Sequence, residues 1–177
     1  MTKVIVRFTI FIIVFSLLAL FQISFPFLWE GMISELNLLP ILLVSLLFFY
    51  NSKTALFAAL MSGFWLDLFS FSFFGLHLIS FVISIFVVDR MLYSWFTNRS
   101  IYSYVIVNIL FVVLYLLTSS LLFYFSYIGR TTLSLFNSGF FSSLVFNIAW
   151  SLILSFLAFS PFSLLTKNLR PVFLEKK

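Results

Sequence analysis

The sequence predicts an all-α integral membrane protein, a bundle of six transmembrane helices with a short second and third helix and with both chain ends in the cytoplasm. Three observations predict this fold class. Of the 177 residues, 63% are hydrophobic and 8% are charged, whereas soluble domains have about 45–50% and 25%. The apolar residues form long runs. The basic residues fall almost entirely in alternate connecting segments, as the positive-inside preference requires.

The long apolar runs give the expected spans. A hydrocarbon core of about 30 Å is crossed by about 20 helical residues. The six predicted spans are residues 4–25, 36–50, 54–69, 75–88, 101–127 and 140–165. The first run is long and no small-residue cleavage site follows it, so it is interpreted as a retained helix and not as a signal peptide. Residues 1–177 are therefore expected to form a single transmembrane domain that ends in a basic cytoplasmic tail, 167–177.

The distribution of the ten Lys and Arg residues predicts the orientation. With six spans and the N-terminus inside, only Arg130 lies outside, in a loop at 129–139. The other nine basic residues lie inside: Lys3, Arg7, Lys53, Arg90, Arg99, Lys167, Arg170, Lys176 and Lys177. Basic residues dispersed between apolar runs form no basic stripe, so a nucleic-acid partner is not expected despite the net charge of +5. The chain has no cysteine, which excludes disulfides and thiolate chemistry.

Small residues recur at every fourth position of the third predicted helix. Ala55, Ala59, Gly63 and Asp67 therefore lie on one narrow stripe of that helix. Small residues at this spacing allow a neighbouring helix to approach closely, and such packing drives helix association in lipid. Two interpretations stay open, and they overlap. The stripe is either a packing face within one bundle or a docking groove for the helix of another protein.

Asp67 is the most unusual residue of the chain. A carboxylate deep in a transmembrane helix costs about 2.5–3.5 kcal/mol on insertion scales, so it usually faces the interior and has a partner. Gly75 is able to adopt the backbone angles of a sharp turn, which would place His77 at the level of Asp67. We hypothesise a hydrogen bond between Asp67 and His77. The alternatives are that Asp67 caps the helix beginning near Gly75 or reaches headgroup water.

Chemical motifs are absent from the rest of the sequence. As the only histidine, His77 cannot belong to a histidine-based metal cluster. There is no phosphate-binding loop, no nucleophile with an adjacent base, and no series of ionisable residues through the predicted spans. The sequence therefore predicts neither an enzyme nor a bound cofactor or metal.

The segment around Asp67 resembles a known family. Gly63-Phe64-Trp65-Leu66-Asp67-Leu68, followed by Phe74-Gly75-Leu76-His77, is similar to the central signature of the bacterial rod-shape-determining protein MreD family. Pro40 in the preceding short helix also matches, and Phe74 belongs to the turn of the signature. The specific similarity covers residues 37–80, while length, basic ends and hydropathy agree over the whole chain.

This resemblance implies a multi-pass protein of the bacterial inner membrane and a non-enzymatic role in cell elongation. The implied partner is the scaffold protein MreC, whose single transmembrane helix would dock on the bundle. Through MreC the protein would connect indirectly to MreB filaments and to RodA with its transpeptidase, and so help to position peptidoglycan synthesis. The sequence leaves the oligomeric state open, including a homo-oligomer.

A different class of function is the substrate-binding membrane subunit of an energy-coupling-factor vitamin transporter. Such subunits also have six spans and short second and third helices. Their first helix carries small residues four apart, whereas here Ser16 and Ala19 are three apart among bulky residues. This difference disfavours the carrier. Vitamin co-purification would support the carrier, and recovery of a single-span scaffold would support the MreD-like role.

Overall fold

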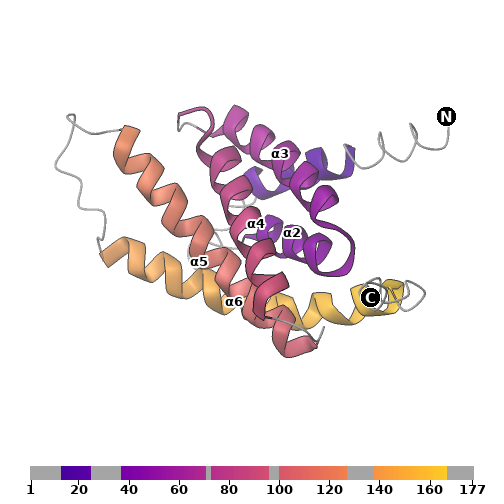
Figure 1. Cartoon of the computed structure of the whole chain (residues 1–177). Coiled ribbons are helices and arrows are strands. Elements are labelled where there is room, and N and C mark those ends of the chain that lie inside the picture. The colour runs from indigo at the N-terminus through magenta and orange to yellow at the C-terminus, as the bar shows by residue number, and fades with distance from the viewer. Residues whose placement is uncertain (1–12, 25–36, 71–72, 96–99, 127–137, 167–177) are drawn as a thin grey trace.

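The computed structural model describes residues 13–24, 37–70, 73–95, 100–126 and 138–166. All regular secondary structure in these residues is helical, which confirms the predicted all-α class for this part of the chain. The six described helices are the N-terminal helix Ile13–Ser24, α2 Leu38–Phe49, α3 Ser52–Phe69, α4 Leu76–Trp95, α5 Ile101–Ser126 and α6 Ser138–Thr166 (Figure 1).

Three of these helices are long enough and apolar enough to cross a membrane. They are α4 over Leu76–Ser94, α5 over Ile101–Ser126 and α6 over Phe141–Phe159. At 1.5 Å per residue, a segment of 19 residues is about 28 Å long, close to the thickness of the hydrocarbon core. The helices Ile13–Ser24 and Leu38–Phe49 are apolar but shorter. Length and composition of the long helices are those of a membrane protein.

The short helix α2 lies at the centre of the bundle. It contacts α3, α4, α5 and α6, and eight of its 12 residues are buried. A helix that is apolar on all sides is stable when protein surrounds it on all sides. Pro40 is the third residue of α2 and is buried. Because the first-turn N–H groups of a helix have no partner within it, proline breaks no helical hydrogen bond there.

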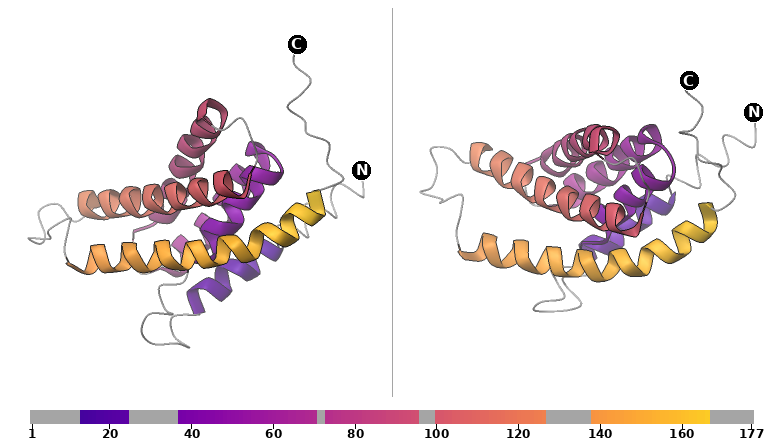
Figure 2. Two further views of the ribbon diagram at one scale, coloured as in Figure 1. Left: turned by 90° about the horizontal axis from the view of Figure 1, so that it is seen from below. Right: turned by 60° about the horizontal axis from the view of Figure 1, so that its bottom comes forward.

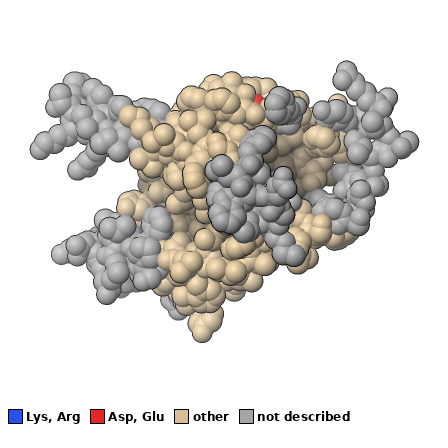
Figure 3. Space-filling view, turned by 180° about the vertical axis from the view of Figure 1, so that it is seen from behind, with Lys and Arg blue, Asp and Glu red and all other residues tan. Residues whose placement is uncertain are grey.

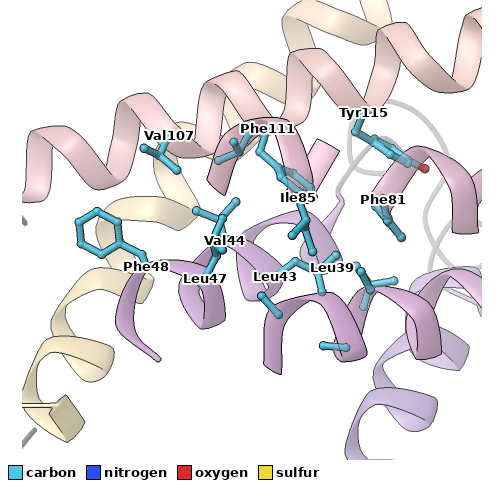
Figure 4. Packing of buried hydrophobic residues seen from close by; sticks show 14 of the residues in the cluster. Leu39, Leu43, Val44, Leu47, Phe48, Phe81, Ile85, Val107, Phe111 and Tyr115 are labelled. Atoms are coloured by element: carbon cyan, nitrogen blue, oxygen red, sulfur yellow. The ribbon is translucent and has the colours of Figure 1, made fainter. Parts of the chain in front are cut away.

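The remaining helices pack around α2 in chain order. α3 packs on α4, α4 on α5, and α5 on α6. Figure 2 shows the long helices α5 and α6 running side by side. The core combines side chains of α2, such as Val44 and Leu47, with Phe81 of α4 and with Phe111 and Tyr115 of α5 (Figure 4). The consecutive packing of neighbours follows from short connections between antiparallel helices.

The outward-facing side chains are mostly apolar. Phe86, Val145 and Leu157 are each at least 62% exposed. On the face in Figure 3, the described residues show no Lys or Arg and only a small patch of acidic colour. A soluble protein would expose charged residues at these positions, whereas lipid stabilises an apolar exterior.

The helix that contains the fourth predicted span extends beyond Val88. α4 continues through Asp89 and Arg90 as far as Trp95. Asp89 accepts a hydrogen bond from the hydroxyl of Ser52, at the start of α3. A charged pair marks where a helix leaves the apolar region, but neither residue prevents the helical backbone from continuing.

The turn before α3 is also shorter than expected. α3 begins at Ser52 and not at Thr54, so Tyr50 and Asn51 alone connect it to α2. Several expectations lie outside the described residues, namely the loops at 26–35 and 129–139, the tail at 167–177 and eight of the ten basic residues. Lys53 and Arg90 are the two basic residues that lie in the described part.

Candidate functional site at the α3–α4 turn

The small residues of α3 are packed against the bundle. Ala55 and Ala59 have no exposed surface, and Gly63 is also buried. A Cβ atom built on Gly63 would come within 2.5 Å of the Cα of Leu78, so the backbones of α3 and α4 touch at this point. Because these positions are covered by the chain's own helices, they form a packing face. Of the two interpretations, packing within the bundle is the one that describes these positions in the structure.

Asp67 connects α3 to the beginning of α4. Its carboxylate accepts hydrogen bonds from three backbone N–H groups, those of Gly75 (3.1 Å), His77 (2.8 Å) and Leu78 (3.0 Å). The side chain is 4% exposed. The first N–H groups of a helix have no partner within the helix, and the positive end of the helix dipole favours an anion there. Asp67 therefore caps α4 from the preceding helix.

The turn itself depends on Gly75. Its φ of +101° lies in the left-handed region, which residues with a Cβ rarely adopt. This backbone conformation directs its N–H toward the Asp67 carboxylate. Phe74 is 58% exposed and its ring meets that of Phe64 edge-on, with ring centroids 5.8 Å apart. The turn is thus held by polar contacts on its inner side and by an aromatic pair on its outer side.

The hypothesised contact between Asp67 and His77 involves the histidine backbone. The imidazole Nδ1 of His77 lies 2.9 Å from the hydroxyl of Tyr115 in α5, and the tautomer determines which atom donates. Because His77 is in the first turn of α4, its N–H points along the helix toward Asp67 while its side chain extends sideways toward α5. The two groups of His77 therefore bind different helices, and the residue joins α3, α4 and α5.

Neutral polar side chains connect three further elements on the same side of the bundle. Gln22 accepts a hydrogen bond from the N–H of Leu38 (2.8 Å) and donates to the side chain of Asn37 (2.8 Å). Asn37 in turn donates to the side chain of Asn147 in α6. Asn147 also donates to the carbonyl of Ser143 in its own helix (2.9 Å). The amides thus fasten the start of α2 to the N-terminal helix and to α6.

A cavity of about 210 Å³ is lined by His77 and Tyr115 and by the amides of Gln22 and Asn37, together with apolar residues. It is partly open, and five helices or their flanking residues contribute to its wall. The lining residues are Gln22, Ile23, Asn37, Leu39, Pro40, Leu66, Ser70, His77, Phe81 and Tyr115. Sequence reasoning identified Pro40 and His77 as residues of interest but missed Gln22, Asn37 and Tyr115. In the sequence, each of these three residues is a polar side chain near or within an apolar run. That feature alone does not show that they share a cavity.

The structure thus combines three helices that are long and apolar enough to cross a membrane with a capped α3–α4 hairpin beside a cavity of mixed polar and apolar lining. Comparison with protein-family models, curated proteins and solved structures found no match. Among the described residues, no group of three or more His, Asp and Glu is placed to hold a metal ion.

Proposed function

We propose that this protein is a non-enzymatic membrane component of the bacterial cell-elongation machinery, similar to MreD. In this role it sits in the inner membrane and docks the single transmembrane helix of an MreC-like scaffold protein. The scaffold links it indirectly to MreB filaments and to RodA with its transpeptidase.

One observation carries the proposal. The residues behind the resemblance to MreD act together as one structural unit, since Gly63 makes the close helix contact, Asp67 caps α4 and Gly75 forms the turn. A chance similarity between short apolar segments would have no reason to select three residues with interdependent roles. The combination of a close helix contact, a buried acid and a left-handed glycine is therefore more specific than the sequence motif alone.

We also propose six spans with both chain ends in the cytoplasm. The nine-to-one distribution of basic residues supports this orientation. The central position of α2 supports its assignment as a span despite a length of only 12 residues. At about 18 Å it is shorter than the hydrocarbon core, but the neighbouring helices surround it and shield it from lipid.

The docking surface of this proposal lies on the outside of the bundle. The stripe of Ala55, Ala59 and Gly63 is occupied by the chain's own helices. A partner helix in lipid gains mainly van der Waals contacts, so it requires a surface of fixed shape. The Asp67 cap and the Gly63 contact contribute to docking indirectly, because they hold α3 and α4 in one arrangement.

The test is affinity capture of the tagged full chain in mild detergent, combined with depletion in the rod-shaped cell that produces it. We expect capture of a scaffold protein with one transmembrane helix, and rounding of depleted cells. Expression of the wild-type chain should restore the rod shape. Capture of ATPase subunits with a transporter scaffold, with no change of cell shape, would contradict the proposal and support the vitamin carrier.

A further inference from the structure

The cavity beside the α3–α4 turn has the features of a binding site that the proposed docking function does not use. Ligand pockets combine apolar walls with a few convergent polar groups. Here the lining includes the hydrogen-bonded pair Gln22 and Asn37 and the pair His77 and Tyr115, each residue from a different element. Gln22 and Tyr115, more than 90 positions apart in the chain, thus line the same cavity.

The lining determines the charge of a suitable ligand. Among the described residues that line it are two amides, one serine hydroxyl, one imidazole and one phenol, and none of these described residues is Lys, Arg, Asp or Glu. The nearby Asp67 carboxylate is already bound by three backbone N–H groups. A charged ligand would lose its hydration without gaining an opposite charge, which is costly in a partly buried site. Amides and hydroxyls both donate and accept, so they suit an uncharged ligand with both kinds of group.

Two aromatic rings of the lining determine the shape. The rings of Phe81 and Tyr115 are stacked, with centroids 4.6 Å apart and an angle of 20° between their planes. Figure 4 shows the two side chains next to each other, one from α4 and one from α5. Aromatic side chains favour offset or edge contacts with other rings. A planar ring is therefore the form that gains most from these two rings.

The volume limits the size. A cavity of about 210 Å³ is below the usual range of roughly 300–1,000 Å³ for drug-sized ligands. It has room for roughly seven water molecules at about 30 Å³ each, or for one small ring with a polar substituent. We propose that this cavity binds a small, uncharged, planar heterocycle that carries both a hydrogen-bond donor and an acceptor, with Tyr115 as one of its hydrogen-bonding partners.

The test uses two matched pairs of probes, nicotinamide with nicotinate and uracil with orotate. Each pair shares a ring, and one member carries a carboxylate. Binding to the purified full chain in detergent is measured by ligand-observed NMR and by thermal unfolding. We expect saturable binding of at least one neutral probe, with its acidic counterpart at least about tenfold weaker.

Two tyrosines of α5 provide the matched variants. Tyr115→Phe removes the hydroxyl at the cavity and keeps the ring against Phe81, so the Kd of the neutral probe should rise about tenfold or more. Tyr104→Phe removes a buried hydroxyl that contacts Ser45 (2.7 Å) and does not line the cavity, so the Kd should stay unchanged. Ile23→Trp, which fills the cavity from the N-terminal helix, should abolish binding.

Failure to bind either neutral probe would overturn the inference, and so would equal binding of a neutral probe and its acid. Unchanged binding by both Tyr115→Phe and Ile23→Trp would also overturn it. If Tyr115→Phe does not fold, the result depends on Ile23→Trp. The control for Ile23→Trp is its thermal unfolding without probe, which should match that of the wild-type protein. Capture of a scaffold protein is a separate measurement, so the docking proposal is not affected by these outcomes.

Discussion

Gly63 and Leu78 bring the backbones of α3 and α4 into contact. A methyl group on Gly63 would lie 2.5 Å from the Cα of Leu78 and 3.0 Å from its backbone nitrogen, with no flexible side-chain end able to move away. One turn further along α3, Asp67 binds the N–H of the same leucine. The steric contact and the hydrogen bond therefore define the same helix spacing.

Gly63→Ala should destabilise the protein by about 1–3 kcal/mol, because the added methyl group overpacks a backbone contact. In an unconstrained helix the same change stabilises by about 1 kcal/mol, so the sign of the effect is diagnostic. The measurement is unfolding in detergent followed by circular dichroism. Ile83→Val, at a 40%-exposed position of α4, is the control and should have a small effect. A more stable Gly63→Ala protein would show that α3 and α4 are further apart.

Asp67→Ala should destabilise more than Asp67→Asn. The alanine variant leaves three backbone N–H groups at the start of α4 without their acceptor, and each unsatisfied buried group costs about 1–3 kcal/mol. The asparagine variant retains one acceptor oxygen but loses the charge that the helix N-terminus favours.

The control for Asp67 is Asp89→Asn, at the other end of the α3–α4 pair. Asp89 is half-buried and accepts one hydrogen bond from Ser52. We expect its loss to change the free energy of unfolding by less than that of either Asp67 variant. Equal effects at both positions would argue against a special role for the α4 cap.

His77 and Tyr115 should be energetically coupled. A double-mutant cycle of His77→Phe and Tyr115→Phe is expected to give about 0.5–1.5 kcal/mol, the usual net value of one hydrogen bond. The control cycle pairs His77→Phe with Tyr104→Phe, whose hydroxyl binds Ser45 and not His77. Coupling in the control cycle as large as in the first would mean that the measured energy does not come from the bond between His77 and Tyr115.

The absence of cysteine makes a topology test direct, since any introduced cysteine is the only one in the chain. In intact cells, a membrane-impermeant thiol reagent should label Thr132→Cys and should leave Lys53→Cys unlabelled until the membrane is opened. Cysteines placed at the two chain ends should behave like Lys53→Cys. Labelling of only one chain end in intact cells would contradict an even number of spans.

The sequence predicted the features that depend on local periodicity. The four-residue spacing of Ala55, Ala59 and Gly63 indicated a packing stripe, and the structure shows all three positions buried. The class of all-helical membrane protein followed from composition and apolar runs. Helix limits were less accurate. The apolar run of the fourth predicted span ends at Val88, although α4 continues to Trp95, because hydropathy reports the membrane boundary and not the end of helical hydrogen bonding.

The cavity could not be predicted, because its residues are distant in sequence. Tyr115 has no local feature that indicates contact with His77, 38 positions earlier. Gln22 and Asn37 flank a predicted loop, and the contact of the N-terminal helix with the start of α2 brings them together. The capping role of Asp67 was one of several alternatives in the sequence. Choosing among them requires the position of the Gly75 turn relative to the carboxylate.

The donors that bind Asp67 also constrain how the chain enters the bilayer during synthesis. The N–H groups of Gly75, His77 and Leu78 are made after α3 is complete. If α3 entered lipid alone, it would bring a carboxylate without these donors, at a cost of about 2.5–3.5 kcal/mol on translocon scales. Partition together with α4 avoids this cost. In the proposed six-span topology, the membrane-insertion machinery should therefore release α3 and α4 into lipid as a pair, one hairpin at a time rather than one helix at a time.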